Sequence, residues 1–207
     1  MLVIWGRNNS VNVQKALWCC EETGIPYQQV DAGGAFGVVN TPAYRKLNPN
    51  GLVPTLSEDD GFVLWESNAI VRYLAAKHGA GNLWPDDPHI RAAADQWMDW
   101  QVSTFWPAIR SLFLGLVRTP PAERDSKAIE GSREKTAEVL GIVDAHLASR
   151  PFLAGDAMTM GDIPLGCGVW RWMALPIERP RLPNVQRWFD SLARRPAYKK
   201  TVMLPLT

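Results

Sequence analysis

The pattern of apolar and polar positions in the first part of the chain alternates between the two periods of regular secondary structure. Short apolar runs bounded by glycine, proline or polar residues predict strands at residues 2–5, 27–30 and 62–65. Apolar positions spaced by three or four residues predict a helix that starts at Val13 and ends at Gly24, because Pro26 prevents it from resuming. The pattern therefore predicts a mixed α/β structure for this part of the chain.

The next segment completes the same unit. Residues 42–47 predict a short helix, and residues 53–56 form an apolar run in which Pro54 marks an edge or an irregular backbone. The pair Asp60-Gly61 is a tight-turn signal that joins this run to the strand at residues 62–65. Helical spacing then continues as far as His78. The resulting order, strand–helix–strand–helix–strand–strand–helix, is the thioredoxin-like arrangement.

The rest of the chain is predicted to be helical. Turn formers mark residues 80–88 as a linker, and helical patterns follow at residues 89–116, 122–149 and 185–195, the first of them kinked by Pro107. The expected fold class is an α/β thioredoxin-like domain at residues 1–79 followed by an all-α domain at residues 89–207. Thr159 and Asp162 fit a capping box for one more helix, with Met158 and Ile163 as its hydrophobic staple.

Composition and charge exclude several classes of function. The 207 residues are 46% hydrophobic and carry a net charge of +1, which indicates a packed core and argues against a nucleic-acid partner. No stretch approaches the roughly 20 apolar residues that cross a bilayer, and no signal peptide is visible, so no membrane partner is expected. Three cysteines, two of them adjacent, give neither a disulfide framework nor a metal site. The default location is the reducing cytoplasm.

Two familiar motifs are also absent. A thioredoxin relative often carries Cys-x-x-Cys at the start of its first helix, but residues 9–12 here read Asn-Ser-Val-Asn, which does not support dithiol chemistry. The glycine-rich stretch at residues 31–41 lacks the lysine and the strand-to-helix setting of a phosphate loop.

The stretch from Asn48 to Ile70 carries a resemblance to a known family. Val53-Pro54, followed by Glu66-Ser67 and an apolar helix, resembles the glutathione-binding half of a cytosolic glutathione transferase. The capping box at Thr159 resembles the one in the second domain of that family. The alternative is an ordinary hairpin packed on a helix. With the second match included, the resemblance covers the whole chain.

The resemblance implies how glutathione would be held. The peptide bond before Pro54 is expected to be cis, with the Val53 backbone facing the cysteinyl part of glutathione as an added strand would. Glu66 and Ser67 are expected to bind the ammonium and the carboxylate of the γ-glutamyl end. The histidine that binds the glycyl carboxylate in some relatives has no clear match, and the candidates are Asn40, Thr41 and Lys46. Glutathione is the expected co-substrate, without a further cofactor.

The residue that activates the thiol is expected just after the first strand. Counted back from Gly24-Ile25-Pro26, Ser10 falls on the serine of the theta and zeta classes, and Asn12 falls where a nu-like bacterial group has asparagine. Cys19 and Cys20 lie too deep in the helix to act as a cysteine-class residue. Ser10 could instead be a simple helix cap, because serine is favoured there, and both roles could hold at once.

The second substrate is expected to be a small apolar electrophile that binds between the domains. The candidate contacts are Trp106 and Arg110, although most aromatic side chains at this spacing form core and an exposed arginine is an ordinary surface residue. The first interpretation is a bacterial, serine-type glutathione transferase. The alternatives are a nu-like glutathione-dependent disulfide or peroxide reductase and a binding protein of the same fold with little catalysis. The family resemblance and the ten tryptophans favour a homodimer.

Overall fold

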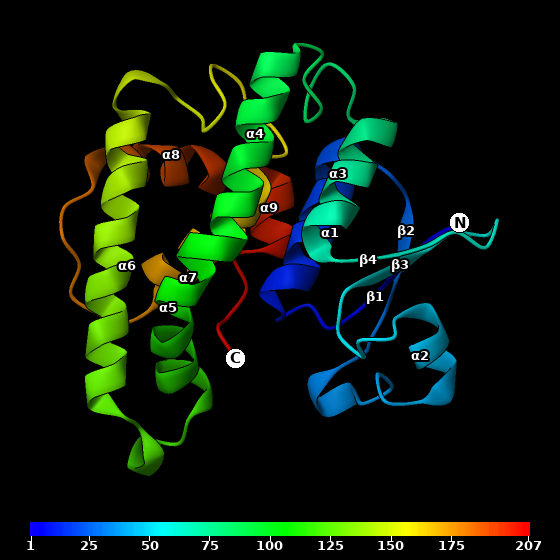
Figure 1. Ribbon diagram of the computed structural model, residues 1–207, viewed down its shortest axis with the longest axis horizontal. Coiled ribbons are helices and arrows are strands. Elements are labelled where there is room, and N and C mark those ends of the chain that lie inside the picture. Colours follow the sequence, from blue (N-terminus) through cyan, green and yellow to red (C-terminus); the bar gives the residue numbers. More distant parts are fainter.

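The computed structural model describes residues 1–207 and contains an α/β half followed by a helical half (Figure 1). The strands are β1 (Leu2–Trp5), β2 (Tyr27–Val30), β3 (Thr55–Ser57) and β4 (Val63–Trp65). The helices of the first half are α1 (Val11–Thr23), α2 (Pro42–Leu47) and α3 (Ser67–His78), with a 3₁₀ turn η1 at Gly34–Phe36. The expected order of elements is confirmed, with α1 beginning two residues earlier than predicted.

The sheet has the strand order β2-β1-β3-β4. Strand β1 pairs in parallel with β2 and antiparallel with β3, which pairs antiparallel with β4. Helices α1 and α3 pack against each other beside the sheet. Helix α2 is tied to this half through Tyr44, whose ring lies 6.1 Å from that of Trp5. The parallel β1–β2 pair needs the α1 crossover, and the antiparallel β3–β4 pair needs only the turn at Gly61. The expected thioredoxin-like half is confirmed.

The second half is entirely helical. Its α-helices are α4 (Pro88–Trp100), α5 (Trp106–Phe113), α6 (Ser126–His146), α7 (Asp162–Ala174), α8 (Pro183–Ala193) and α9 (Pro196–Thr201). Two π turns, η2 (Gln101–Phe105) and η3 (Leu114–Arg118), flank α5, and two 3₁₀ turns, η4 (Pro121–Glu123) and η5 (Leu147–Ser149), flank α6. The division into two domains joined by residues 80–88 stays a prediction.

The long helix predicted around Pro107 departs from regular geometry, as expected. The N–H of Trp106 donates to the Gln101 carbonyl, five residues back, so that α4 and α5 are joined by a π turn. Proline has no N–H to donate to residue 103, and the wider turn accommodates its ring. The predicted helix at residues 122–149 is shorter than expected, because its ends are 3₁₀ turns. Helix α9 was not predicted.

The capping box at α7 forms as expected and has further partners. A side-chain oxygen of Asp162 accepts from the Thr159 N–H at 2.9 Å, and the Thr159 hydroxyl accepts from the Gly161 N–H at 3.2 Å. Asp162 also accepts from the Leu153 N–H at 3.0 Å and from the Trp188 indole at 2.9 Å. Burial raises the pKa of Asp162 to about 6 despite these bonds. The residue therefore joins α7, α8 and the preceding loop.

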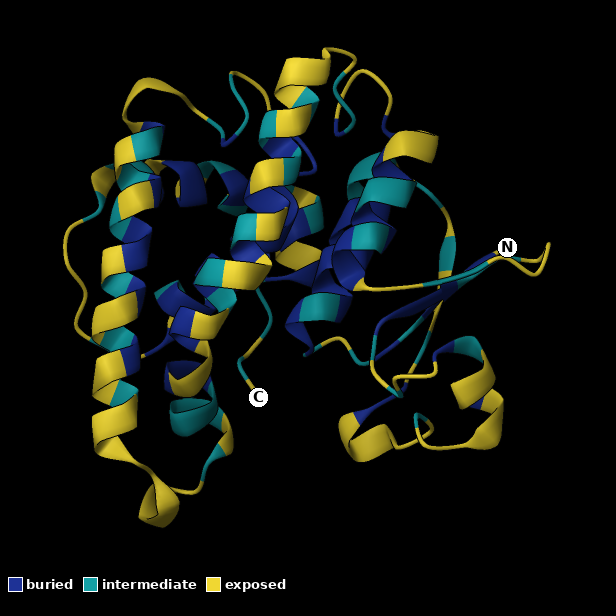
Figure 2. Ribbon diagram, viewed as in Figure 1, coloured by how far each residue is buried: buried dark blue, intermediate teal, exposed yellow.

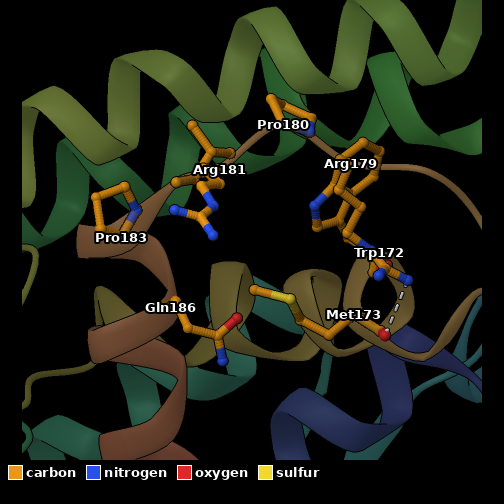
Figure 3. A pocket seen from close by; sticks show the side chains of 8 residues that line it. Trp172, Met173, Arg179, Pro180, Arg181, Pro183 and Gln186 are labelled. Carbon is orange, nitrogen blue, oxygen red and sulfur yellow. Dashed lines mark hydrogen bonds between the residues drawn. The ribbon is translucent and has the colours of Figure 1, made fainter.

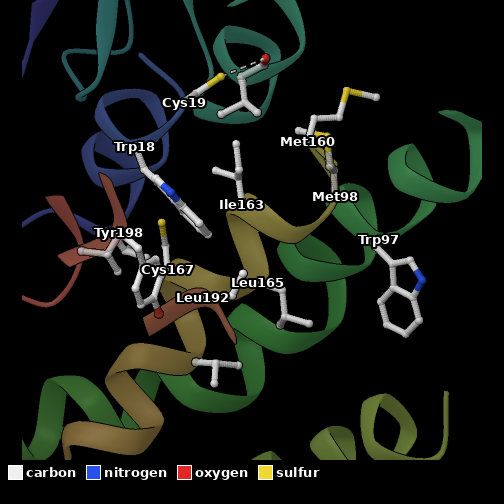
Figure 4. Close-up of a cluster of buried hydrophobic side chains, with 14 of the residues drawn as sticks. Trp18, Cys19, Trp97, Met98, Met160, Ile163, Leu165, Cys167, Leu192 and Tyr198 are labelled. Carbon is white, nitrogen blue, oxygen red and sulfur yellow. Dashed lines mark hydrogen bonds between the residues drawn. The ribbon is translucent and has the colours of Figure 1, made fainter. Parts of the chain in front are cut away.

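One continuous core of 41 buried residues runs through both halves (Figure 2). Its centre is the contact of α1 with α7 and α9, where the Trp18 ring lies 4.6 Å from that of Tyr198 (Figure 4). Gly166 permits this approach, because a Cβ there would lie 2.8 Å from the Trp18 ring. Helix α1 is thus buried between the sheet and the helical half, and its N-terminus is held in place by both. None of the helices is both long and apolar enough to cross a membrane.

Candidate functional site

The loop from β1 to α1 places Ser10 at the N-cap position of α1. Its backbone carbonyl accepts from the Gln14 N–H at 2.9 Å, and the residue is 8% exposed. The Ser10 side chain, however, makes no hydrogen bond to the helix. The simple-cap interpretation is therefore wrong for the hydroxyl group, which is left free to act on another partner at the positive end of the helix dipole.

Val53 lies in the loop just before β3 and follows the expected geometry. The Val53–Pro54 peptide bond is cis, as the resemblance implied. Neither the N–H nor the carbonyl of Val53 hydrogen-bonds within the chain. An extended ligand can use both groups as an added strand would.

Hydrogen bonds from two buried side chains hold the loop that contains Val53. The Tyr44 hydroxyl donates to the Leu52 carbonyl at 2.7 Å, and the Asn48 amide donates to the same carbonyl at 2.9 Å. The hydroxyl of Thr55 contacts both of them, at 2.9 Å from Tyr44 and 3.1 Å from Asn48. The sequence predicted only a turn at residues 48–51, and these supporting residues were missed.

Glu66 and Ser67 stand at the start of α3. Glu66 is the N-cap residue, has φ of 71°, and its exposed side chain makes no hydrogen bond. Ser67 is the first helical residue, is buried, and donates from its hydroxyl to the Asn12 side-chain oxygen at 3.3 Å. The starts of α1 and α3 therefore meet, which brings two helix N-termini to one place.

A small pocket joins most of the predicted glutathione-binding residues. Asn12, Val53, Pro54, Glu66 and Ser67 all line it, together with Asn48, Asn50 and Leu52. Ser10 does not line this pocket, although it lies two residues before Asn12. If Ser67 donates to the oxygen of the Asn12 amide, the NH₂ group of Asn12 remains available as a donor.

Lys15 lies directly beneath this pocket and was not predicted. Its Nζ is buried and donates to Gln101 Oε1 at 2.9 Å, to Asn68 Oδ1 at 3.2 Å and to Ser67 Oγ at 3.4 Å. Burial lowers its pKa from 10.5 to about 8. The π turn η2 supplies Gln101, so this lysine links the helical half to the hydroxyl group of Ser67. Lys15 is the one charged residue among residues 11–20, and that was the available signal.

Other predicted contacts are not part of the pocket. Asn40 accepts from the Arg45 guanidinium at 2.9 Å, Thr41 caps α2 by accepting from the Tyr44 N–H at 3.2 Å, and Lys46 is exposed without a partner. Trp106 is half-buried on α5, and Arg110 is exposed one turn further along. Their roles in binding stay predictions.

Several side chains that could bind or react with a substrate are instead buried in the core. Of the aromatic side chains on α4, η2, α5 and α7, four are buried in the core: Trp97, Phe105, Phe113 and Trp172. The three cysteines are free and buried, and burial raises the pKa of Cys20 and of Cys167 to about 12. No group of His, Cys, Asp or Glu side chains is arranged to hold a metal ion.

A separate cavity of about 540 Å³ lies between α7 and the start of α8 (Figure 3). None of the predicted site residues lines it. Its Arg179 guanidinium donates to the carbonyls of Trp172 at 3.0 Å and Met173 at 3.1 Å, and so closes the end of α7. The cavity shares no lining residue with the pocket at α1 and α3.

The fold and the pocket define a protein with a thioredoxin-like half, which offers two helix N-termini and a free strand backbone to a ligand, and a helical half. The glutathione S-transferase N-terminal domain model matches residues 9–77, and the C-terminal domain model matches residues 98–196. The chain is 44% identical to glutathione S-transferase GstB of Escherichia coli (strain K12), over 100% of both chains.

Solved structures agree with these matches. A theta-class glutathione S-transferase from Xanthomonas axonopodis pv. citri with glutathione bound is 54% identical, with a TM-score of 0.96 over 100% of this chain and 99% of that one. Glutathione transferase F7 from Populus trichocarpa is 26% identical, with a TM-score of 0.88 over 99% of this chain and 100% of that one. The chain belongs to the glutathione S-transferase family. The expected family, fold and enzyme class are confirmed.

Proposed function

We propose that the chain binds glutathione in the pocket between α1 and α3 and activates its thiol with the Ser10 hydroxyl for attack on small electrophiles. One observation carries the proposal: Ser10 is buried at the N-terminus of α1, and its hydroxyl is not used as a cap. The bound glutathione in the Xanthomonas relative supports the choice of co-substrate. No further cofactor is part of the proposal.

The pocket residues suit the parts of glutathione. The free N–H and carbonyl of Val53, next to Pro54, pair with the cysteinyl backbone. The exposed Glu66 carboxylate pairs with the γ-glutamyl ammonium, and Ser67 with its N–H receives the α-carboxylate at the start of α3. Lys46 and Asn40 are kept as candidates for the glycyl carboxylate, and Trp106 for the electrophile.

The energy that this mechanism needs is modest. A free thiol has a pKa of about 8.5, so only a few per cent is thiolate at neutral pH. Each unit of lowering requires about 1.4 kcal/mol of preferential stabilisation of the thiolate. A hydrogen bond to a charged group contributes about 1.5–3 kcal/mol, and the N-terminus of α1 adds to it. One hydroxyl group is therefore sufficient.

A second function is favoured by Asn12. Its side-chain oxygen is engaged by Ser67, which leaves its NH₂ group as a second donor for sulfur. In a glutathione-dependent disulfide or peroxide reductase, the thiolate attacks a sulfur or an oxygen atom. A second donor then stabilises the sulfur or oxygen leaving group. The family resemblance also supports a homodimer, which we include in the proposal.

The test is the substitution Ser10→Ala. Loss of the donor should raise the pKa of bound glutathione towards its free value, measured by thiolate absorbance against pH. Conjugation to an aromatic halide at neutral pH should fall about ten- to a hundredfold, as a loss of roughly 1.4–2.7 kcal/mol implies. The binding affinity and the melting temperature should change little, because the hydroxyl makes no bond to the helix.

The matched variants separate the alternatives. Ser149→Ala removes an exposed hydroxyl on η5 and should leave the thiolate pKa unchanged. If Asn12→Ala raises the thiolate pKa and Ser10→Ala does not, the asparagine is the donor. Faster turnover with a small disulfide than with the halide would favour the reductase, and turnover of neither would leave a binding protein.

A further inference from the structure

The buried ammonium of Lys15 has no carboxylate partner within the chain. Lys15 is 1% exposed, and its three acceptors are the neutral side-chain oxygens of Gln101, Asn68 and Ser67. None of the ion pairs of the structure includes it. At pH 7 the charged form still predominates, because this pH lies below the lowered pKa of about 8. A cation buried without a counter-ion is unfavourable, so a ligand that brings an anion close to it gains affinity.

The lysine lies under the glutathione pocket without lining it. Ser67 and Asn12 line the pocket, whereas Lys15 and Gln101 do not. The Ser67 oxygen accepts from Lys15 at 3.4 Å, and its hydroxyl donates to the Asn12 side-chain oxygen at 3.3 Å. Because a hydroxyl group has a single proton, these two bonds direct that proton away from the ammonium and towards the pocket. Lys15 therefore reaches a ligand through Ser67 and not by direct contact.

The helical half holds the ammonium in this place. The π turn η2 supplies Gln101, which is 1% exposed and makes the shortest of the three bonds, at 2.9 Å. Asn68 accepts from the lysine at 3.2 Å, and its own amide group donates to the Met98 carbonyl of α4 at 2.8 Å. Amide oxygens accept a hydrogen bond without carrying a negative charge. The lysine is thus fixed by both halves while its charge is left unbalanced.

The charges at this end of the pocket match those of the γ-glutamyl end of glutathione, which carries an ammonium and an α-carboxylate on one carbon. The Glu66 side chain is exposed at the start of α3 and makes no hydrogen bond, so it is free to pair with the ammonium. Glu66 is also the one carboxylate whose charge raises the pKa of Lys15. Once Glu66 is paired with the ligand, the α-carboxylate is the counter-charge that remains for Lys15.

We propose that Lys15 is a positioning residue that makes the glutathione pocket selective for the α-carboxylate of the γ-glutamyl end. This inference rests on the proposed function. The ammonium donates to the Ser67 oxygen and polarises the hydroxyl, which strengthens the bond that this hydroxyl donates to the carboxylate of bound glutathione. The same charge gives no advantage to a ligand with a neutral group at that position. The selectivity therefore comes from a cation that the ligand does not touch.

The test compares glutathione with 4-aminobutanoyl-cysteinylglycine, which lacks only the α-carboxylate. The dissociation constants of both are measured by calorimetry at pH 7. Lys15→Met should weaken glutathione binding about tenfold or more, the fold-change for one charge-assisted hydrogen bond, and leave the affinity for the analogue unchanged. KM for glutathione should rise by the same factor. The kcat at saturating glutathione and the pKa of the bound thiol should stay unchanged, because Ser10 is not altered.

A second variant, Gln101→Glu, keeps the lysine and its packing. The new carboxylate has the shape of the amide that it replaces and lies against the Lys15 ammonium, where the amide oxygen now accepts at 2.9 Å. It supplies the missing counter-charge from within the chain, so glutathione binding should again weaken about tenfold while binding of the analogue does not. A purely structural role of Lys15 predicts no such loss, because every bond of the lysine is retained.

Two controls test for a general effect of charge. Lys127→Met removes an exposed lysine from α6, and Gln96→Glu adds a carboxylate to the exposed face of α4. Both should leave the two affinities unchanged. Melting temperatures are measured for all variants, and if Lys15→Met does not fold, Gln101→Glu decides. Equal losses for the two ligands in Lys15→Met, or undiminished glutathione binding in Gln101→Glu, would overturn the role of Lys15 and leave the proposed function intact. An original chain that binds neither ligand would overturn both.

Discussion

At the scale of single residues, Lys15 places an ammonium group in the interior of the protein, where it is buried from solvent. Its ammonium has three oxygen partners and no carboxylate among them. Burial disfavours the charged form, and this is the main cause of its lowered pKa. The charge still orients the Ser67 hydroxyl, which accepts from Lys15 and donates to Asn12, so it acts on the glutathione pocket through Ser67.

This burial predicts a pH dependence of stability. The pKa of Lys15 falls from 10.5 in the unfolded chain to about 8 in the folded protein. Between these values the unfolded chain holds a proton that the folded protein has released, so the free energy of unfolding rises with pH. The stability that this residue contributes is complete above the unfolded pKa and is lost as the pH falls through about 8.

Comparison with Lys15→Met isolates the effect. The free energy of unfolding in urea, measured from pH 7.5 to 10.5, should rise by about 3 kcal/mol more in the original chain than in the variant. Lys127→Met, which removes an exposed lysine from α6, controls for the change in net charge. If the free energy of unfolding changed with pH in the same way in the original chain and in Lys15→Met, the pKa of Lys15 would not be lowered by folding.

The site could be predicted from the sequence only where a local motif marks it. Val53-Pro54 and Glu66-Ser67 are recognisable by their spacing, and all four line the pocket. The contact of Ser67 with Asn12 joins residues 55 positions apart, and nothing in either local sequence records it. The burial of Lys15 depends on packing between the two halves, so residue type alone could not distinguish it from a surface residue.

At the scale of elements, the start of α7 also combines contacts that a local motif predicts with contacts that depend on packing. The capping box was predicted from Thr159 and Asp162 because both residues lie within one turn of helix. The bonds from Leu153 and Trp188 to Asp162 come from a loop and from α8. The α-helix α9 was missed because Pro196 follows Arg195 directly, and a proline ends one helix as readily as it begins the next.

The extra bonds predict that Asp162 matters more than an ordinary capping residue. Asp162→Ala should leave the N–H groups of Leu153, Thr159 and Trp188 unpaired in a buried place. At about 1 kcal/mol or more for each, the free energy of unfolding should fall by about 3 kcal/mol or more. Thr159→Ala should lower it by only about 1 kcal/mol.

Asp156→Ala is the matched control, because Asp156 is an exposed acid of the loop before α7. Its free energy of unfolding should stay within about 0.5 kcal/mol of the original. Denaturant titration of the three variants gives the comparison. An equal effect of Asp162→Ala and Thr159→Ala would mean that the bonds to Leu153 and Trp188 contribute nothing.

At the scale of the whole molecule, both halves leave large apolar side chains in solvent. Trp65 on β4 is 39% exposed, and Val102 on η2 is 52% exposed. Ile142 on α6 is 53% exposed, but α6 lies on the side of the helical half away from the sheet (Figure 1). If the α/β half of one copy met the helical half of the other in a two-fold dimer, each such contact would be made twice.

This arrangement predicts a homodimer in which Trp65 and Val102 are covered. Equilibrium sedimentation at micromolar concentration should give twice the mass of the chain. Trp65→Glu or Val102→Glu should shift the protein towards the monomer, because each places two charges in an apolar interface. Ile142→Glu adds the same charge outside that interface and should remain dimeric. A monomer at this concentration would contradict the prediction, and a dimer that only Ile142→Glu disrupts would place the interface on α6.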